Sequence, residues 1–227
     1  MLVTTTRGAA GRDDAALPLL IVLPWSRSTP AELLSEVGYT EIDAPARVIA
    51  IEGFEPDRGG FSFWVRTRPA PTDPEAVDVE RLELVAARAS RLAALFARLR
   101  AHFHTYGLPV VSGVSQGADL SLALALHHRG SVAAALPVAA RASVPPPAGQ
   151  AVPPIDAFHG MDDAEAAPFL ALARAVALLR AQGVPIVLHA YPGVRHEIGT
   201  ELRRDLLACA AARLGGSHLA CGARARP

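Results

Sequence analysis

The sequence is poor in cysteine, has no excess of charge of either sign and contains no long uninterrupted hydrophobic run. Its two cysteines, Cys209 and Cys221, cannot build a disulfide framework and lack the spacing of zinc ligands, so a reducing, cytoplasmic environment suits them. The 22 basic residues balance the 22 acidic ones, whereas proteins that bind nucleic acid usually have a basic excess. We therefore expect no nucleic acid as the main partner.

The apolar run near the N-terminus is interrupted by Pro18 and Pro24 and is preceded by Asp13 and Asp14. A membrane span needs about 20 apolar residues and a signal peptide begins with basic residues, so we expect neither. The chain is 51% hydrophobic and 19% charged, against averages of about 45–50% and about 25%, which excludes an intrinsically disordered protein. Its 227 residues fit one domain that buries about 70% of the unfolded surface.

Short apolar runs alternate with helical patterns along the chain. The apolar runs are mostly continuous, which is typical of parallel strands covered on both faces. We expect strands at residues 19–23, 47–52, 109–112, 132–138, 155–158 and 186–190. Helices are expected after the capping box that begins at Thr29, and over residues 79–103, 119–128, 164–182 and 197–214. This alternation predicts an α/β fold: a mostly parallel open sheet with helices on both faces.

We expect a single domain over residues 16–215, with flexible tails at 1–15 and 216–227. Two loops, at 53–78 and 139–154, are long enough to be functional, but neither is long enough to form a large lid. Phe61 and Trp64 of the first loop, together with Trp25, are candidates for lining a substrate pocket. Packing of these aromatic side chains under the loop is an equally good interpretation.

The strongest functional motif is Gly113-Val-Ser115-Gln116-Gly117, which matches the G-x-S-x-G nucleophile elbow. It follows an expected strand and precedes an expected helix, as this turn requires. The glycines are needed because the turn leaves no room for side chains beside the serine. We expect the turn to raise the Ser115 hydroxyl above the sheet edge and to aim the backbone N–H of Gln116 at a developing oxyanion.

Candidates for the acid and the base follow in the order that this fold demands, Ser…Asp…His. Asp162 and Asp163 follow the strand expected at 155–158, and His196 follows the strand expected at 186–190. All three positions lie at the carboxyl edge of the sheet, where open α/β sheets place their sites. Either aspartate could orient a histidine while the other caps the following helix.

Three blocks of the sequence, GVSQG, FHGMDD and YPGVRHEI, resemble the motifs of the carboxylesterase/lysophospholipase branch of the α/β-hydrolases. That branch includes the acyl-protein thioesterases and small bacterial esterases, and the resemblance covers about residues 17–214. It implies that Asp163 is the acid, that His196 is the base, and that Gln116 is typical after the nucleophile. It also implies that neither a metal nor an organic cofactor is used.

One segment departs from this pattern. Where the family has His-Gly-x-Gly after its first strand, this chain has Pro24-Trp25-Ser26-Arg27. By position, the second oxyanion donor would be the backbone N–H of Ser26, because Pro24 has none. The lost glycines could alter the loop, since other residues rarely adopt positive φ, and one missing donor costs about 10²–10³ in turnover.

We therefore expect a serine hydrolase that cleaves small-molecule carboxylic esters through Ser115, His196 and Asp163. A lysophospholipase or acyl thioesterase is the alternative within the family, and a catalytically weak binding protein is the alternative from another class. His159 is expected to be structural. The remaining histidines suggest no metal site, since third and fourth ligands are missing. The oligomeric state is left open, with a homodimer compatible with the sequence.

Overall fold

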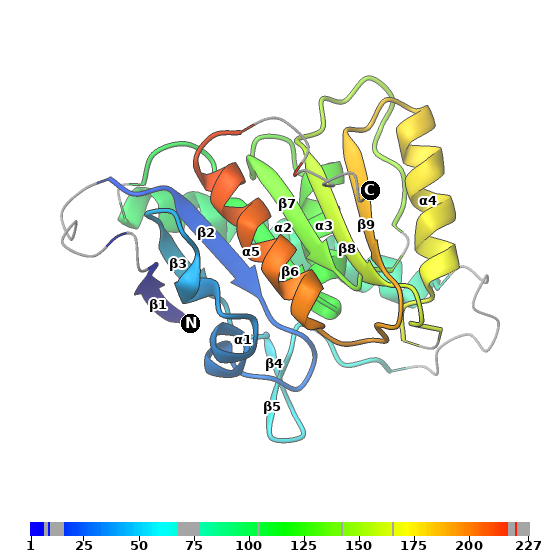
Figure 1. The fold of residues 1–227 in the computed structure, drawn as a ribbon, viewed down its shortest axis with the longest axis horizontal. Helices are drawn as coiled ribbons and strands as arrows, with labels where there is room; N and C mark the ends of the chain where they lie inside the picture. Colours follow the sequence, from blue (N-terminus) through cyan, green and yellow to red (C-terminus); the bar gives the residue numbers. More distant parts are fainter. Residues whose placement is uncertain are drawn as a thin grey trace.

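The computed structural model describes residues 1–6, 9, 16–67, 78–103, 105–141, 143–164, 166–217 and 221. Its centre is a seven-stranded sheet in the order β1-β3-β2-β6-β7-β8-β9, in which only β1 is antiparallel to its neighbour. The strands are β1 (Leu2–Thr5), β2 (Leu19–Leu23), β3 (Arg47–Ala50), β6 (Val110–Val114), β7 (Ala134–Val138), β8 (Ile155–Gly160) and β9 (Ile186–Tyr191). The expected mostly parallel α/β sheet is confirmed (Figure 1).

Helices cover both faces of this sheet. They are α1 (Pro30–Val37), α2 (Val79–His102), α3 (Gln116–His127), α4 (Phe169–Ala181) and α5 (Thr200–Leu214), with a short 3₁₀ turn, η2 (Tyr39–Glu41). Buried side chains of α2, α3 and α4 form one apolar cluster with one face of the sheet, and those of α1 and α5 form a second cluster with the other face. Neighbouring residues of β2, such as Leu19 and Leu20, belong to opposite clusters, which explains why its apolar run is continuous.

Two elements were not expected from the sequence. Residues 2–5, expected to belong to a loose tail, instead form the edge strand β1, paired with β3. Within the loop at 53–78, β4 (Glu55–Asp57) and β5 (Gly60–Ser62) form a separate two-stranded hairpin, which lies below the main sheet in Figure 1. Residues 7, 8 and 10–15 of the expected tail, and residues 68–77 of the loop, lie outside the described part of the chain.

Cys221, a described residue of the second expected tail, is bonded to the body of the domain. Cys221 forms a disulfide with Cys209 on α5, a pairing that the sequence analysis did not foresee. The backbone N–H of Cys221 also donates to the fully buried carboxylate of Asp156, which binds the guanidinium of Arg213 as well. Burial alone would raise the pKa of Asp156, but hydrogen bonds from His189 and Arg213 outweigh it and lower that pKa.

Candidate active site

Ser115 occupies the sharp turn between β6 and α3 with φ 54° and ψ −110°. A non-glycine residue with positive φ is strained, and the glycines on either side explain how the turn is accommodated. A Cβ at Gly113 would lie 2.0 Å from the carbonyl oxygen of Gly117, and one at Gly117 would lie 2.1 Å from that of Leu23. The elbow geometry expected from the motif is therefore present.

The structure brings Ser115, His196 and Asp163 together in one hydrogen-bonded chain. The Nε2 atom of His196 lies 3.0 Å from the Ser115 Oγ, and its Nδ1 lies 2.5 Å from Oδ2 of Asp163. These contacts join residues that are 81 and 33 positions apart in the sequence. With Nδ1–H donating to the carboxylate, Nε2 is left to accept the serine proton.

Of the two candidate aspartates, only Asp163 contacts the histidine. Asp163 is 3% exposed, and its Oδ1 accepts a hydrogen bond from the backbone N–H of Ala167 at 3.1 Å. Asp162 is exposed, and its backbone N–H donates to the Val194 carbonyl. Neither caps a helix, because α4 begins only at Phe169.

His159 lies beneath this chain of residues and is fully buried. Its Nε2–H donates to the Ala167 carbonyl at 2.7 Å, and the same nitrogen lies 3.6 Å from Oδ2 of Asp163. Burial lowers the pKa of His159, although the hydrogen bond to Ala167 partly opposes that effect. A neutral His159 therefore supports the loop that carries the acid, which is the structural placement expected from the sequence.

Two backbone N–H groups are candidates for binding an oxyanion. That of Gln116 belongs to the first turn of α3, whose N–H groups have no partner within the helix. In the turn at residues 25–28, the Ser28 hydroxyl donates to the Trp25 carbonyl at 2.6 Å. Within the described part of the chain, no backbone acceptor takes the Ser26 N–H. Arg27, where the resembling family has glycine, nevertheless adopts φ 63°.

The hairpin β4–β5 and the two residues directly after it contact these two segments. The Ser62 hydroxyl accepts from the backbone N–H of Arg27 at 3.1 Å and donates to Asp57 at 2.8 Å. Just after the hairpin, the side-chain amide of Gln116 accepts from the Phe63 N–H and donates to the Trp64 carbonyl, both at 3.0 Å. Residues 62–64 thus hydrogen-bond to both candidate oxyanion segments.

The three aromatic side chains expected to line a pocket have different environments. Trp64 is 2% exposed and belongs to the core cluster under α2 and α3, which favours the packing interpretation for this residue. Trp25 is partly buried and packs against the cluster under α1 and α5. Phe61 is half-buried in β5, where its backbone pairs with Ser28.

A buried charged cluster beside the elbow was missed by sequence reasoning. Asp119, in the first turn of α3, is 2% exposed; its Oδ2 lies 3.2 Å from Nη1 of Arg81, and its Oδ1 accepts from the Arg141 N–H at 2.8 Å. The Nε of Arg141 lies 3.7 Å from the same carboxylate. This cluster ties the start of α3 to α2 and to the loop after β7. An available signal was that Asp119 is the sole acidic residue between positions 84 and 155.

Among the described residues, the one group with the geometry of metal ligands is Asp156, Cys209 and Cys221. Both sulfur atoms are already joined in the disulfide, so this group does not offer thiolates to a metal. In the same part of the chain, no helix is both long and apolar enough to cross a membrane.

No family model matches the chain, and no curated protein matches it. Solved structures do resemble it. Esterase PE8 matches with a TM-score of 0.72 at 19% identity, over 91% of this chain and 95% of that one. A carboxylesterase from Mesorhizobium loti matches with a TM-score of 0.70 at 20% identity, over 93% of each chain. SOBER1 from Arabidopsis thaliana matches with a TM-score of 0.67 at 18% identity, over 88% of this chain and 99% of that one.

At these identities the likeness establishes the architecture. The chain has the α/β-hydrolase fold, as its three motif blocks led us to expect.

Proposed function

We propose that the protein is a serine hydrolase that cleaves carboxylic esters. The observation that carries the proposal is the hydrogen-bonded chain from Ser115 through His196 to Asp163, built on a strained elbow. A nucleophile, a base and a group that orients the base are the parts that acyl transfer requires. The fold is shared with solved structures described as esterases and carboxylesterases, which supports the same reaction class.

In the proposed reaction, the Ser115 Oγ attacks the ester carbonyl while His196 Nε2 takes its proton. Asp163 keeps His196 in the required tautomer and stabilises the imidazolium. The backbone N–H groups of Gln116 and Ser26 bind the oxyanion. His196 then protonates the departing alcohol, activates a water molecule, and the acyl-enzyme is hydrolysed.

A small ester is the preferred substrate class, with lysophospholipids and acyl thioesters as the alternatives. Trp25 stands where the resembling family has glycine, and we expect this larger side chain to favour short acyl chains. A weak binding protein on the same fold is less favoured, because Arg27 takes a left-handed conformation suited to glycine despite its side chain.

The compartment is a separate proposal. Cysteine usage suggested the cytoplasm, but disulfides rarely persist in a reducing cytosol. The bond between Cys209 and Cys221 therefore favours an oxidising compartment. Counting free thiols in denatured protein that was alkylated inside its native cells would distinguish the two.

The test of the enzymatic proposal is the hydrolysis of p-nitrophenyl esters of increasing chain length. Ser115→Ala should fold normally and lose at least about 10³-fold in turnover. Ser90→Ala is a matched control, because Ser90 is an exposed serine on α2. A folded Ser115→Ala variant with full activity would refute the proposal.

A further inference from the structure

Positive charge is concentrated in one stretch of this electrically neutral chain. Between positions 84 and 155, Asp119 is the sole acidic residue, and it is buried against Arg81. The same stretch holds six arginines: Arg88, Arg91, Arg98, Arg100, Arg129 and Arg141. Such asymmetry produces a local positive potential that attracts anions, even where the net charge is zero.

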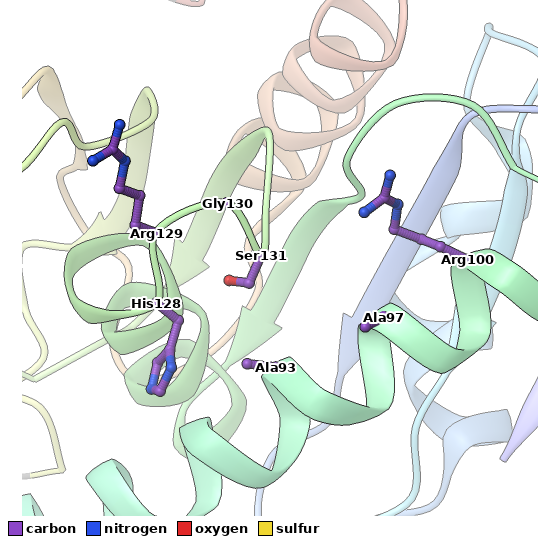
Figure 2. A pocket seen from close by; sticks show the side chains of 7 residues that line it. All are labelled: Ala93, Ala97, Arg100, His128, Arg129, Gly130 and Ser131. Atoms are coloured by element: carbon purple, nitrogen blue, oxygen red, sulfur yellow. The ribbon is translucent and has the colours of Figure 1, made fainter.

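A cavity of about 250 Å³ lies within this basic stretch, at the end of α3 remote from Ser115. Its walls are α2, which contributes Ala93, Ala97 and Arg100, and the loop at residues 128–131 that joins α3 to β7. Figure 2 shows the Arg100 side chain extending from α2 toward this loop. Since α3 has 12 residues, the cavity is separated from the nucleophile by about 18 Å of helix.

Two polar atoms at this cavity are buried without a partner. The Nε of Arg100 and the Oγ of Ser131 have no hydrogen-bond partner among the described residues. Buried donors are normally satisfied, so these two are unusual, and both belong to residues that line the cavity. In the described part of the chain, no carboxylate forms an ion pair with Arg100 or with the exposed Arg129.

The chemistry of the lining indicates the ligand. A guanidinium and a hydroxyl match the oxygens of a tetrahedral oxyanion, and arginine is especially suited to phosphate. Ala93 and Ala97 offer an apolar wall, and the cavity volume exceeds that of a bare phosphate ion. His128 also lines the cavity, and burial, reinforced by neighbouring His127, lowers its pKa.

We propose that this cavity binds a small organic phosphate, with its phosphate group held by Arg100, Ser131 and Arg129. The competing explanation is that these arginines only compensate the negative ends of α2 and α3. The unpartnered Nε of Arg100 argues against this explanation, because its N–H makes no hydrogen bond to a carbonyl at a helix end.

The experiment is isothermal titration of the full chain at pH 7 and constant ionic strength, with glycerol 3-phosphate and inorganic phosphate as probes. We expect saturable binding of one glycerol 3-phosphate per chain, tighter than that of inorganic phosphate. Arg100→Gln should weaken it by about tenfold or more, because it removes a charge-assisted contact. Ser131→Ala should weaken it by a smaller factor.

Arg98→Gln is the matched control, because Arg98 is exposed on the same helix and does not line the cavity. If Arg98→Gln and Arg100→Gln weakened glycerol 3-phosphate binding equally, the effect would come from the general positive potential of the helix. That result would overturn the proposed site. Absence of saturable binding would overturn it as well, and equal affinity for both probes would overturn the organic-phosphate assignment. Ester hydrolysis should be unchanged in all three variants, so this proposal and the enzymatic one can fail independently.

Discussion

At the scale of single residues, the choice between Asp162 and Asp163 depends on burial and direction. Both follow β8, and both are compatible with orienting a histidine when only the sequence is considered. In the structure, the buried carboxylate of Asp163 contacts His196, whereas Asp162 is exposed. The motif resemblance had selected the same residue on independent grounds.

The expected consequence is a large difference between two conservative substitutions. Asp163→Asn should lower turnover by on the order of 10³-fold or more, because an amide cannot hold the imidazole in the productive tautomer. Asp162→Asn should change it by no more than about threefold, as is usual for an exposed side chain without a catalytic contact. Steady-state kinetics with p-nitrophenyl acetate measures both, and the reverse ranking would move the acid to Asp162.

At the scale of elements, the hairpin β4–β5 could not be predicted from the sequence. Its strands have three residues each, too few for a periodic pattern. Ser62 in the hairpin contacts Arg27, 35 positions away, and Phe63 directly after it contacts Gln116, 53 positions away. The edge strand β1 was missed for a similar reason, because it is mostly exposed and pairs with distant β3. The buried strands were predicted because their apolar runs are continuous.

Helix beginnings were predicted less well than helix ends. The pattern indicated a helix from residue 164, but α4 begins at Phe169, after Pro168. The preceding residues are held by side chains of the site, since Ala167 bonds to both Asp163 and His159. Likewise α5 begins at Thr200, directly after Gly199. The catalytic candidates were predictable because each lies in the segment that follows a strand of the sheet. Their supporting contacts were not, because they form only when the chain is folded.

Removing the hairpin's hold on Arg27 tests whether this element shapes the oxyanion site. Ser62→Ala loses the acceptor for the Arg27 N–H, so we expect kcat to fall by about tenfold with little change in KM. The loss should be smaller than the 10²–10³ typical of a missing donor, because the turn is loosened rather than removed. Ser90→Ala is again the control. Unchanged kcat in stably folded Ser62→Ala would contradict this role for the hairpin.

At the scale of the whole molecule, buried histidines couple stability to pH. The folded-state pKa of His159 is lowered by burial, so below about pH 6.5 the unfolded chain binds a proton that the folded chain does not. The free energy of unfolding should therefore fall as the pH drops from 7.5 to 5.5. A single histidine contributes at most about 1.4 kcal/mol per pH unit. Half-buried His127 and His128, whose pKa values are also lowered, act in the same direction.

Urea unfolding at several pH values measures this dependence. The slope between pH 6.5 and 5.5 should be shallower in His159→Gln than in the parent protein, whatever its overall stability. His102→Gln should keep the parent slope, because His102 is exposed at the end of α2. An identical slope in His159→Gln would show that His159 is protonated alike in both states.

The central claim is that Ser115 is the nucleophile of an acyl-transfer site, and covalent trapping tests it most directly. A fluorophosphonate should add one phosphonyl group per chain, located by peptide mass spectrometry on Ser115. Labelling should be absent in Ser115→Ala and much slower in His196→Ala, because the serine then loses its base. An adduct on a different residue, or an unlabelled protein that still hydrolyses esters, would contradict the account.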